Sequence, residues 1–210
     1  MTRTPWPLAF GVFTVIHLVL VVAEASPWDS ITKCVLAPIL AVWVLRERGP
    51  RILALALVFC FFGDLFLTFP WFLAGMGAFA LGHVTFIGYF LSRGARAALA
   101  SWWPAAVVYA VVTVAMVIWL WPGLEQGLRI PVAIYAALLA TTATVALAVD
   151  RFAGLGALAF LVSDAVIAMG QADYWQPQPS DLWIMALYLL GIFYLTSASL
   201  ARERRRSPVR

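Results

Sequence analysis

Charged residues are scarce in this sequence. Only 11% of its 210 residues are charged and 64% are hydrophobic, whereas a soluble domain carries about 25% charged residues. Cysteine and histidine are also scarce, with two of each. Two thiols within apolar runs build neither a disulfide framework nor a zinc knuckle. The composition therefore excludes an ordinary soluble domain and a disulfide-stapled scaffold.

Apolar runs close to the ~20 residues that a membrane-spanning helix needs recur along the whole chain. The eight runs are Trp6–Ala23, Ile31–Leu45, Ile52–Phe69, Phe72–Leu91, Trp102–Trp121, Ile130–Val149, Phe152–Gly170 and Leu182–Leu200. The loops between them are too short to hold a soluble domain. We therefore expect an all-α fold in which residues 1–210 form a single integral membrane domain of eight transmembrane helices.

The basic residues are distributed unevenly between the two sides of such a bundle. With the N-terminus inside, twelve of the fourteen basic residues fall in inner segments, Arg129 lies in an outer loop and Lys33 lies near a helix start. The inner residues are Arg3, Arg46, Arg48, Arg51, Arg93, Arg96, Arg151, Arg202, Arg204, Arg205, Arg206 and Arg210. This asymmetry follows the positive-inside rule and predicts that both termini are cytoplasmic, in a bacterial inner membrane. The basic tail 201–210 is expected to bind anionic lipid headgroups, not nucleic acid.

Two aspartates interrupt the apolar runs. Asp64 lies in Ile52–Phe69 and Asp164 in Phe152–Gly170, and neither run contains another charge. A carboxylate at this depth costs at least ~2.5–3.5 kcal/mol on insertion scales, so we expect each aspartate to have a charge or hydrogen-bond partner or a function. Two acids close together in a low dielectric do not both ionise, so the pair is a candidate general acid/base couple.

A third ionisable group is expected at the same depth. Each aspartate lies twelve residues beyond the inner end of its run, a rise of about 18 Å. His83 lies eleven residues from the outer end of its own run, a rise of about 16 Å. We therefore predict that Asp64 and Asp164 face one shared cavity with His83 at its level. A role for either aspartate or for His83 in holding the bundle together is the competing interpretation.

Further candidates surround this level. Ser163 belongs to a small-residue face that favours close helix packing, and Tyr89 continues a seven-residue spacing of small residues beside His83. Lys33 and Glu24 lie at the outer mouth above the aspartates. We predict that these four residues contact substrate. Helix packing, a snorkelling lysine and an ordinary loop charge are the alternatives.

A faint internal repeat is also present. A shift of one hundred residues places Gly63-Asp64 on Ser163-Asp164 and Arg51 on Arg151 without a gap. Such a repeat would fit two four-helix halves in parallel orientation.

Four short motifs resemble those of the YhhN-like lysoplasmalogenase family. Thr32–Pro38 resembles its TK-x-x-x-x-P helix entry, Phe62–Leu67 its GD helix, Phe79–Phe86 its F-x-x-GH-x-x-Y/F helix and Val162–Asp164 its SD helix. The motifs occur in the family's order and cover most of the chain. The last helix departs from the pattern, because Ser197 stands where the family tends to show glutamine.

The resemblance implies hydrolysis of the vinyl ether bond of a lysophospholipid, the lysoplasmalogen, to a fatty aldehyde and a glycerophospho-headgroup. The reaction needs an acid that protonates the vinyl carbon and a carboxylate that stabilises the resulting cation. Asp64 and Asp164 would fill these roles, His83 would orient water or the leaving oxygen, and Lys33 would hold the phosphate. No cofactor or resident metal is implied. The oligomeric state is left open.

Three other readings stay open from the residues themselves. An intramembrane aspartyl protease also uses two aspartates, although Phe61-Phe62-Gly63-Asp64 lacks the first glycine of its G-x-G-D motif. A zinc-dependent lipid hydrolase would need about three nitrogen or oxygen ligands, which His17, His83 and the aspartates could supply. A non-enzymatic lipid-binding or transport protein would use the aspartates to bind a headgroup or to couple protons.

Overall fold

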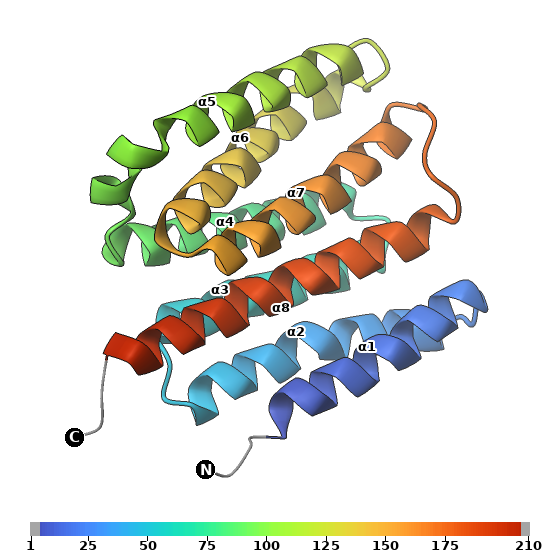
Figure 1. Cartoon of the computed structure of the whole chain (residues 1–210). Helices are drawn as coiled ribbons and strands as arrows, with labels where there is room; N and C mark the ends of the chain where they lie inside the picture. Colours follow the sequence, from blue (N-terminus) through green and yellow to red (C-terminus); the bar gives the residue numbers. More distant parts are fainter. Residues whose placement is uncertain (1–4, 207–210) are drawn as a thin grey trace. The chain divides into compact units, whose positions relative to one another are not determined.

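The computed structural model describes residues 5–206, and these form helices and turns without a β-strand. The eight helices are α1 (Trp6–Val22), α2 (Trp28–Arg46), α3 (Arg51–Leu67), α4 (Phe72–Ser92), α5 (Ala95–Leu120), α6 (Gln126–Val149), α7 (Arg151–Gln171) and α8 (Ser180–Arg206) (Figure 1). The all-α prediction is confirmed, and each apolar run corresponds to one helix. Arg3 and Arg210, which contribute to the predicted charge asymmetry, lie outside the described residues.

Four helices extend by three or more residues beyond the apolar runs that predicted them. α2 begins three residues before Ile31, α5 begins seven before Trp102, α6 begins four before Ile130, and α8 continues to Arg206. Apolar runs end where charge begins, but a helix continues into the headgroup region because long arginine side chains reach water from there. The predicted basic tail is therefore helical as far as Arg206.

Length separates two helices from the other six. Within residues 5–206, α2, α4, α5, α6, α7 and α8 are long and apolar enough to cross a membrane. α1 and α3 have 17 residues each, which is about 25 Å of helix. The protein is therefore an integral membrane protein with at least six helices of spanning length and composition.

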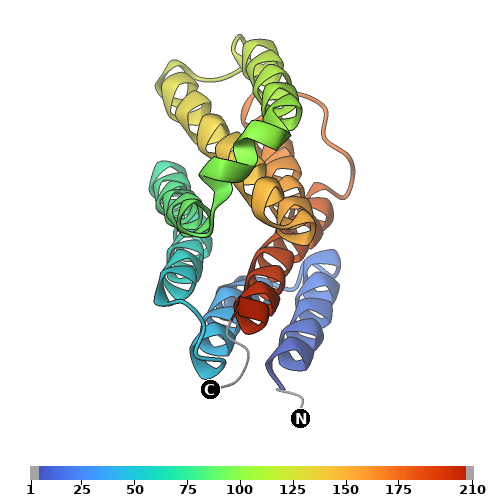
Figure 2. The ribbon, with the colours of Figure 1, turned by 60° about the vertical axis from the view of Figure 1, so that its left-hand side comes forward.

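The chain falls into two compact units. One contains the residues up to Thr85 and those from Leu200 onward, and the other is Phe86–Ser199. In the first unit α2 packs against both α1 and α3, and in the second unit α6 packs against both α5 and α7. Figure 2 shows the green α5 beside the yellow α6. The same order of neighbours recurs in both units, as the faint sequence repeat would require.

Glycines allow close helix contacts within each unit. In the first unit, a Cβ at Gly63 of α3 would lie 2.6 Å from the Phe79 ring of α4. In the second unit, a Cβ at Gly156 of α7 would lie 2.8 Å from the backbone oxygen of Gly191 in α8. Small residues at such crossings let helix backbones approach each other inside a membrane. The small-residue faces predicted from the sequence thus serve packing.

The turn between α6 and α7 is a single residue, Asp150. Its carboxylate accepts hydrogen bonds from the backbone amides of Phe152 (2.8 Å) and Ala153 (3.2 Å). An aspartate in this position satisfies amides that the first turn of a helix leaves without partners. Because the turn is so short, α6 and α7 form an antiparallel hairpin in which residues equally distant from Asp150 lie at one level.

Candidate functional site

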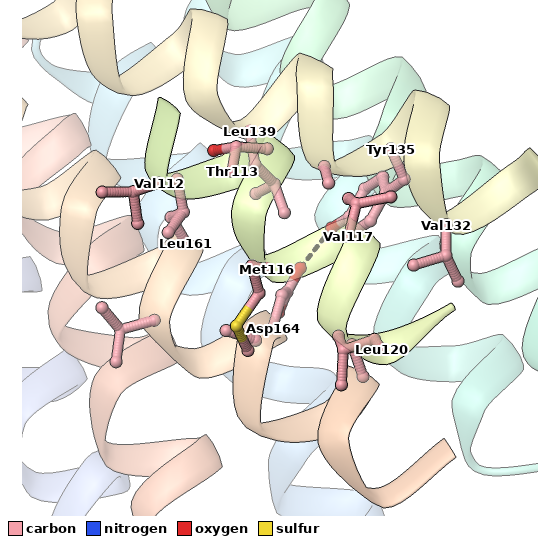
Figure 3. Close-up of a pocket in the computed structure, with 14 residues that line it drawn as sticks. Val112, Thr113, Met116, Val117, Leu120, Val132, Tyr135, Leu139, Leu161 and Asp164 are labelled. Atoms are coloured by element: carbon pink, nitrogen blue, oxygen red, sulfur yellow. Dashed lines mark hydrogen bonds between the residues drawn. The ribbon is translucent and has the colours of Figure 1, made fainter. Parts of the chain in front are cut away.

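The α6–α7 hairpin brings Tyr135 and Asp164 together. Tyr135 lies fifteen residues before Asp150 and Asp164 lies fourteen residues after it, so both lie about 21–22 Å from the turn. The Tyr135 hydroxyl donates a hydrogen bond to Asp164 Oδ2, drawn as a dashed line in Figure 3. A hydroxyl that donates to a carboxyl oxygen fixes the rotamer of the carboxyl group and makes the contact one of the stronger hydrogen bonds.

Asp164 and Tyr135 line a pocket of about 210 Å³ in the second unit. The lining comes from one face of each of three helices, with five residues from α5, four from α6 and five from α7. Successive lining positions on α6 are Val132, Tyr135, Ala136 and Leu139, the three- and four-residue spacing of a single helix face. The lining side chains labelled in Figure 3 come from all three helices.

The lining is almost entirely apolar. Its polar side chains are Thr113, Tyr135 and Asp164, and no lysine, arginine or histidine contributes to it. A hydrocarbon group fits such a lining, whereas a phosphate would find no cation in it. The pocket therefore presents one acidic group to an apolar ligand.

The α2–α3 hairpin of the first unit contains an analogous pair. Lys33 lies fourteen residues before Glu47 and Asp64 lies fourteen residues after Pro50, so the turn again places the two residues at one level. Lys33 Nζ lies 3.9 Å from Asp64 Oδ1. This distance exceeds that of a hydrogen bond, so the contact is an ion pair between two charges. Asp64 is 1% exposed and Lys33 is 21% exposed.

Polar groups continue from Asp64 across the two helices. The Thr68 hydroxyl donates to the backbone oxygen of Asp64 (3.0 Å), and Thr68 Oγ1 lies 3.9 Å from the Cys34 sulfur. Asp64 and Thr68, one turn apart on α3, are thus joined to α2 through Lys33 and Cys34.

His17 of α1 is bound to α2 one residue from Lys33. His17 Nδ1 lies 2.9 Å from Thr32 Oγ1, and that hydroxyl is directed at the backbone oxygens of Trp28 (2.8 Å) and Asp29 (3.0 Å). Because a hydroxyl has one proton, we assign the proton of this contact to His17 Nδ1. The contact ties α1 to α2, which supports a structural role for His17.

The predicted catalytic histidine is buried. His83 lies in α4 within the first unit and is 1% exposed. Its neighbour Gly82 faces α3, because a Cβ at Gly82 would lie 3.5 Å from the Cys60 sulfur. A role for His83 in orienting water stays a prediction.

The remaining predicted site residues have the following surroundings. Ser163 is fully buried and its hydroxyl donates to the backbone oxygen of Ile184 in α8 (2.9 Å). Tyr89 is also fully buried, with the Arg93 guanidinium 5.4 Å from its ring centre. Glu24 is exposed in the turn after α1 and has a positive φ of 50°. Substrate contact by these three residues stays a prediction.

The structure thus joins Asp64 to Lys33 and Asp164 to Tyr135. The sharing of one cavity by the two aspartates stays a prediction, because they belong to different units. Over the part of the chain that the structure describes, no three or more histidine, cysteine, aspartate or glutamate side chains gather as a metal-binding group.

Sequence reasoning missed Tyr135. Its aromatic ring counts among the hydrophobic residues of an apolar run, and neither a charge nor a small-residue spacing marks its position. A usable signal was present in the hairpin geometry. Counting outward from Asp150 reaches Tyr135 after fifteen residues on one side and Asp164 after fourteen on the other.

Comparison with known proteins identifies the family. The YhhN family profile matches residues 28–199. The chain belongs to the YhhN family. Two proteins named lysoplasmalogenase, from Mycobacterium bovis and Mycobacterium tuberculosis, are each 33% identical to this YhhN protein over 215 residues. Each alignment covers 88% of this chain and 81% of the mycobacterial protein. No solved structure matches the chain significantly.

The YhhN match contains both polar pairs. It begins at Trp28, the first residue of α2, and ends at Ser199 in α8. Lys33, Asp64 and the α5–α7 pocket therefore lie inside the region that defines the family, whereas α1 with His17 precedes it.

Proposed function

We propose that this protein hydrolyses the vinyl ether bond of lysoplasmalogens and releases a fatty aldehyde and a glycerophospho-headgroup. The mycobacterial relatives named lysoplasmalogenase support the reaction class. The observation that carries the proposal is the Asp164 carboxyl group in the wall of an apolar pocket, held by the Tyr135 hydroxyl. A vinyl ether is an apolar group that reacts by accepting a proton on carbon, and this pocket supplies one carboxyl group and no basic side chain.

The reaction balances without a cofactor. Asp164 transfers its proton to the β-carbon, and the π electrons of the double bond form the new C–H bond. The cation that results is shared between the α-carbon and the ether oxygen. Water adds to the α-carbon and gives up a proton, which forms a hemiacetal. The glycerol oxygen then takes up the proton that the water gave to a carboxylate and leaves as an alcohol, while the hydroxyl of the hemiacetal returns its proton to Asp164 as the carbonyl forms. One lipid and one water thus become an aldehyde and an alcohol, and the acid is restored.

We assign Asp64 the second acidic role, as the carboxylate that stabilises the cation or accepts the proton of the water. Its ion pair with Lys33 supports this assignment, because the lysine charge offsets a buried carboxylate. Lys33 would also hold the lipid phosphate through its exposed part. His83 would orient the water or the leaving oxygen, and Ser163, Tyr89 and Glu24 would contact the rest of the substrate.

In the proposed arrangement all eight helices span a bacterial inner membrane with both termini in the cytoplasm. The arginines in alternate connecting segments of the sequence support this orientation. α1 and α3 would span by including residues just beyond their ends, such as Ala23 after α1 and Phe69 after α3.

Matched lysolipids test the reaction. Purified protein is incubated with 1-alkenyl, 1-alkyl and 1-acyl lysolipids of one chain length and one headgroup, and the products are measured by mass spectrometry. We expect an aldehyde from the 1-alkenyl lipid alone. In D₂O, with immediate reduction of the product, the aldehyde should carry one deuterium at the carbon next to the carbonyl. In H₂¹⁸O the glycerol oxygen should stay unlabelled, because the bond to the alkenyl carbon breaks.

Other results would move the assignment to a different class. Release of fatty acid from the 1-acyl lipid would indicate a lipase-type hydrolase. Loss of activity with chelators would favour the zinc-dependent alternative. Binding of all three lipids without any product would favour a lipid-binding or transport protein.

A further inference from the structure

We propose that the α5–α7 pocket binds the hydrocarbon chain of the lipid next to the reacting bond, and that the chain enters from the bilayer between α5 and α7. The inference rests on the proposed function for the identity of the lipid. It adds the place where the chain binds, the route by which it enters and the residues that limit its size.

The first argument is the chemistry of the wall. Eleven of the fourteen lining residues have apolar side chains, and the three polar ones carry no positive charge. A headgroup phosphate would lose its hydration there without gaining a cation. A hydrocarbon chain has no such cost, and its attached vinyl ether would lie beside Asp164.

The second argument is the exposure of the rim. Val112 of α5 is 56% exposed and Val162 of α7 is 40% exposed, and both line the pocket. The buried residues of α5 are only Ala95 and Leu120, near its two ends. Since α5 is an apolar membrane helix, its exposed middle faces lipid. A chain that enters past Val112 and Val162 passes from lipid to pocket without crossing water.

The third argument is the small size of three residues in the pocket wall. Ala136 of α6 and Ala165 and Ala168 of α7 line the pocket with single methyl groups. A leucine at any of these positions adds three carbon atoms to a space of about 210 Å³. The alanines are therefore the specificity-determining positions for the chain.

The test compares two leucine substitutions on the same helix. Ala136→Leu narrows the pocket, whereas Ala137→Leu places the same side chain at an exposed position of α6 outside it. For a long-chain vinyl ether lysolipid we expect kcat/KM to fall at least about tenfold in Ala136→Leu, the size of effect that one excess alkyl group has in a hydrophobic pocket. A short-chain substrate should be affected less, and Ala137→Leu should match the wild type. Ala168→Leu serves as a second variant if Ala136→Leu does not fold.

A binding measurement separates this inference from the reaction. A 1-O-alkyl lysolipid has no vinyl ether to hydrolyse, and a photoreactive diazirine in its chain labels nearby residues. We expect labelling of α5 near Met116 and Val117, reduced in Ala136→Leu and retained in Ala137→Leu. Labelling elsewhere, with vinyl ether hydrolysis intact, overturns the chain site and leaves the proposed function. Labelling at these residues without hydrolysis of any lipid refutes the function and leaves the chain site.

Discussion

Tyr135→Phe removes the hydroxyl that donates to Asp164 Oδ2 and keeps the ring that lines the pocket. We expect the variant to bind lipid as the wild type does, because the apolar wall is unchanged. The rate of the proton transfer should fall, because the Asp164 carboxyl group loses the contact that fixes its direction. Tyr135 is therefore a positioning residue, and the change should appear in kcat and not in KM.

The magnitude follows from the strength of the lost contact. Asp164 becomes charged as it gives up its proton in the transition state, and a hydrogen bond to a charged group contributes roughly 1.5–3 kcal/mol. If that contact is realised fully in the transition state, kcat falls about 10- to 150-fold. Aldehyde release from a 1-alkenyl lysolipid, trapped as a hydrazone and followed at saturating substrate, gives kcat directly.

A matched variant separates positioning from stability. The Tyr174 hydroxyl donates to the backbone oxygen of Trp119 (3.1 Å) within the same unit but outside the pocket. Tyr174→Phe should change thermal unfolding and leave kcat within about twofold of the wild type. The reasoning fails if Tyr135→Phe keeps wild-type kcat, or if its lost activity parallels a loss of folded protein.

Further predictions concern the charged pairs, the helix crossing and the topology. Asp64→Asn and Asp164→Asn should each lower kcat by at least about 100-fold. The double variant should be little worse than either, because the effects of residues that act as one unit are not additive. Additive losses in a kinetic double-mutant cycle would contradict a joint role. Lys33→Met should raise KM about tenfold with a smaller change in kcat, because uniform binding of the phosphate is lost; steady-state kinetics measure both, and an unchanged KM would refute phosphate binding. Gly156→Ala should destabilise the protein by about 1–3 kcal/mol through overpacking, since its Cβ would meet α8 backbone at 2.8 Å, whereas Gly127→Ala has open space and should be neutral in thermal unfolding. Of two reporters fused to the C-terminus, the one that works only in the cytoplasm should be active and the one that works only in the periplasm should be inactive. Activity of the periplasmic reporter would reverse the proposed orientation.

The helices were predictable because a bilayer imposes a strong constraint on composition. A spanning segment must satisfy its backbone internally and present apolar side chains, so each helix leaves an apolar run in the sequence. Helix ends were less predictable, because a helix continues into the headgroup region where arginines are tolerated. The start of α5 at Ala95 and the end of α8 at Arg206 are two helix ends of this kind.

The partners of the aspartates could be found only from the position of the turn in each hairpin. Depth alone identified Asp64 and Asp164, but their partners follow from which residues form the turn of each hairpin. Glu47 to Pro50 sets the level of Lys33 against Asp64, and Asp150 sets that of Tyr135 against Asp164. Tyr135 carries no charge and belongs to no small-residue spacing, so neither of these signals marked it as a partner of Asp164.

The role of Ser163 shows a limit that turn counting does not remove. Its hydroxyl donates to Ile184 of α8, a contact that depends on the rotation of α8 about its own axis. That rotation is set by the crossing at Gly156 and Gly191, whose partners are far apart in the sequence. The sequence identified Ser163 as a polar residue on a packing face but held no local signal for its acceptor.

The length of α5 makes bilayer thickness a variable of this protein. Its apolar run, Trp102–Trp121, has 20 residues, about 30 Å at the usual helical rise, which equals the thickness of a typical hydrocarbon core. In a thinner bilayer the run is longer than the core, and the helix tilts to accommodate the difference. Because α5 supplies one wall of the pocket and is buried only near its ends, a change in its tilt would change the width of the pocket. We therefore expect the acyl composition of the surrounding membrane to alter the reaction rate, and a rate measured in a detergent micelle to differ from the rate in a bilayer.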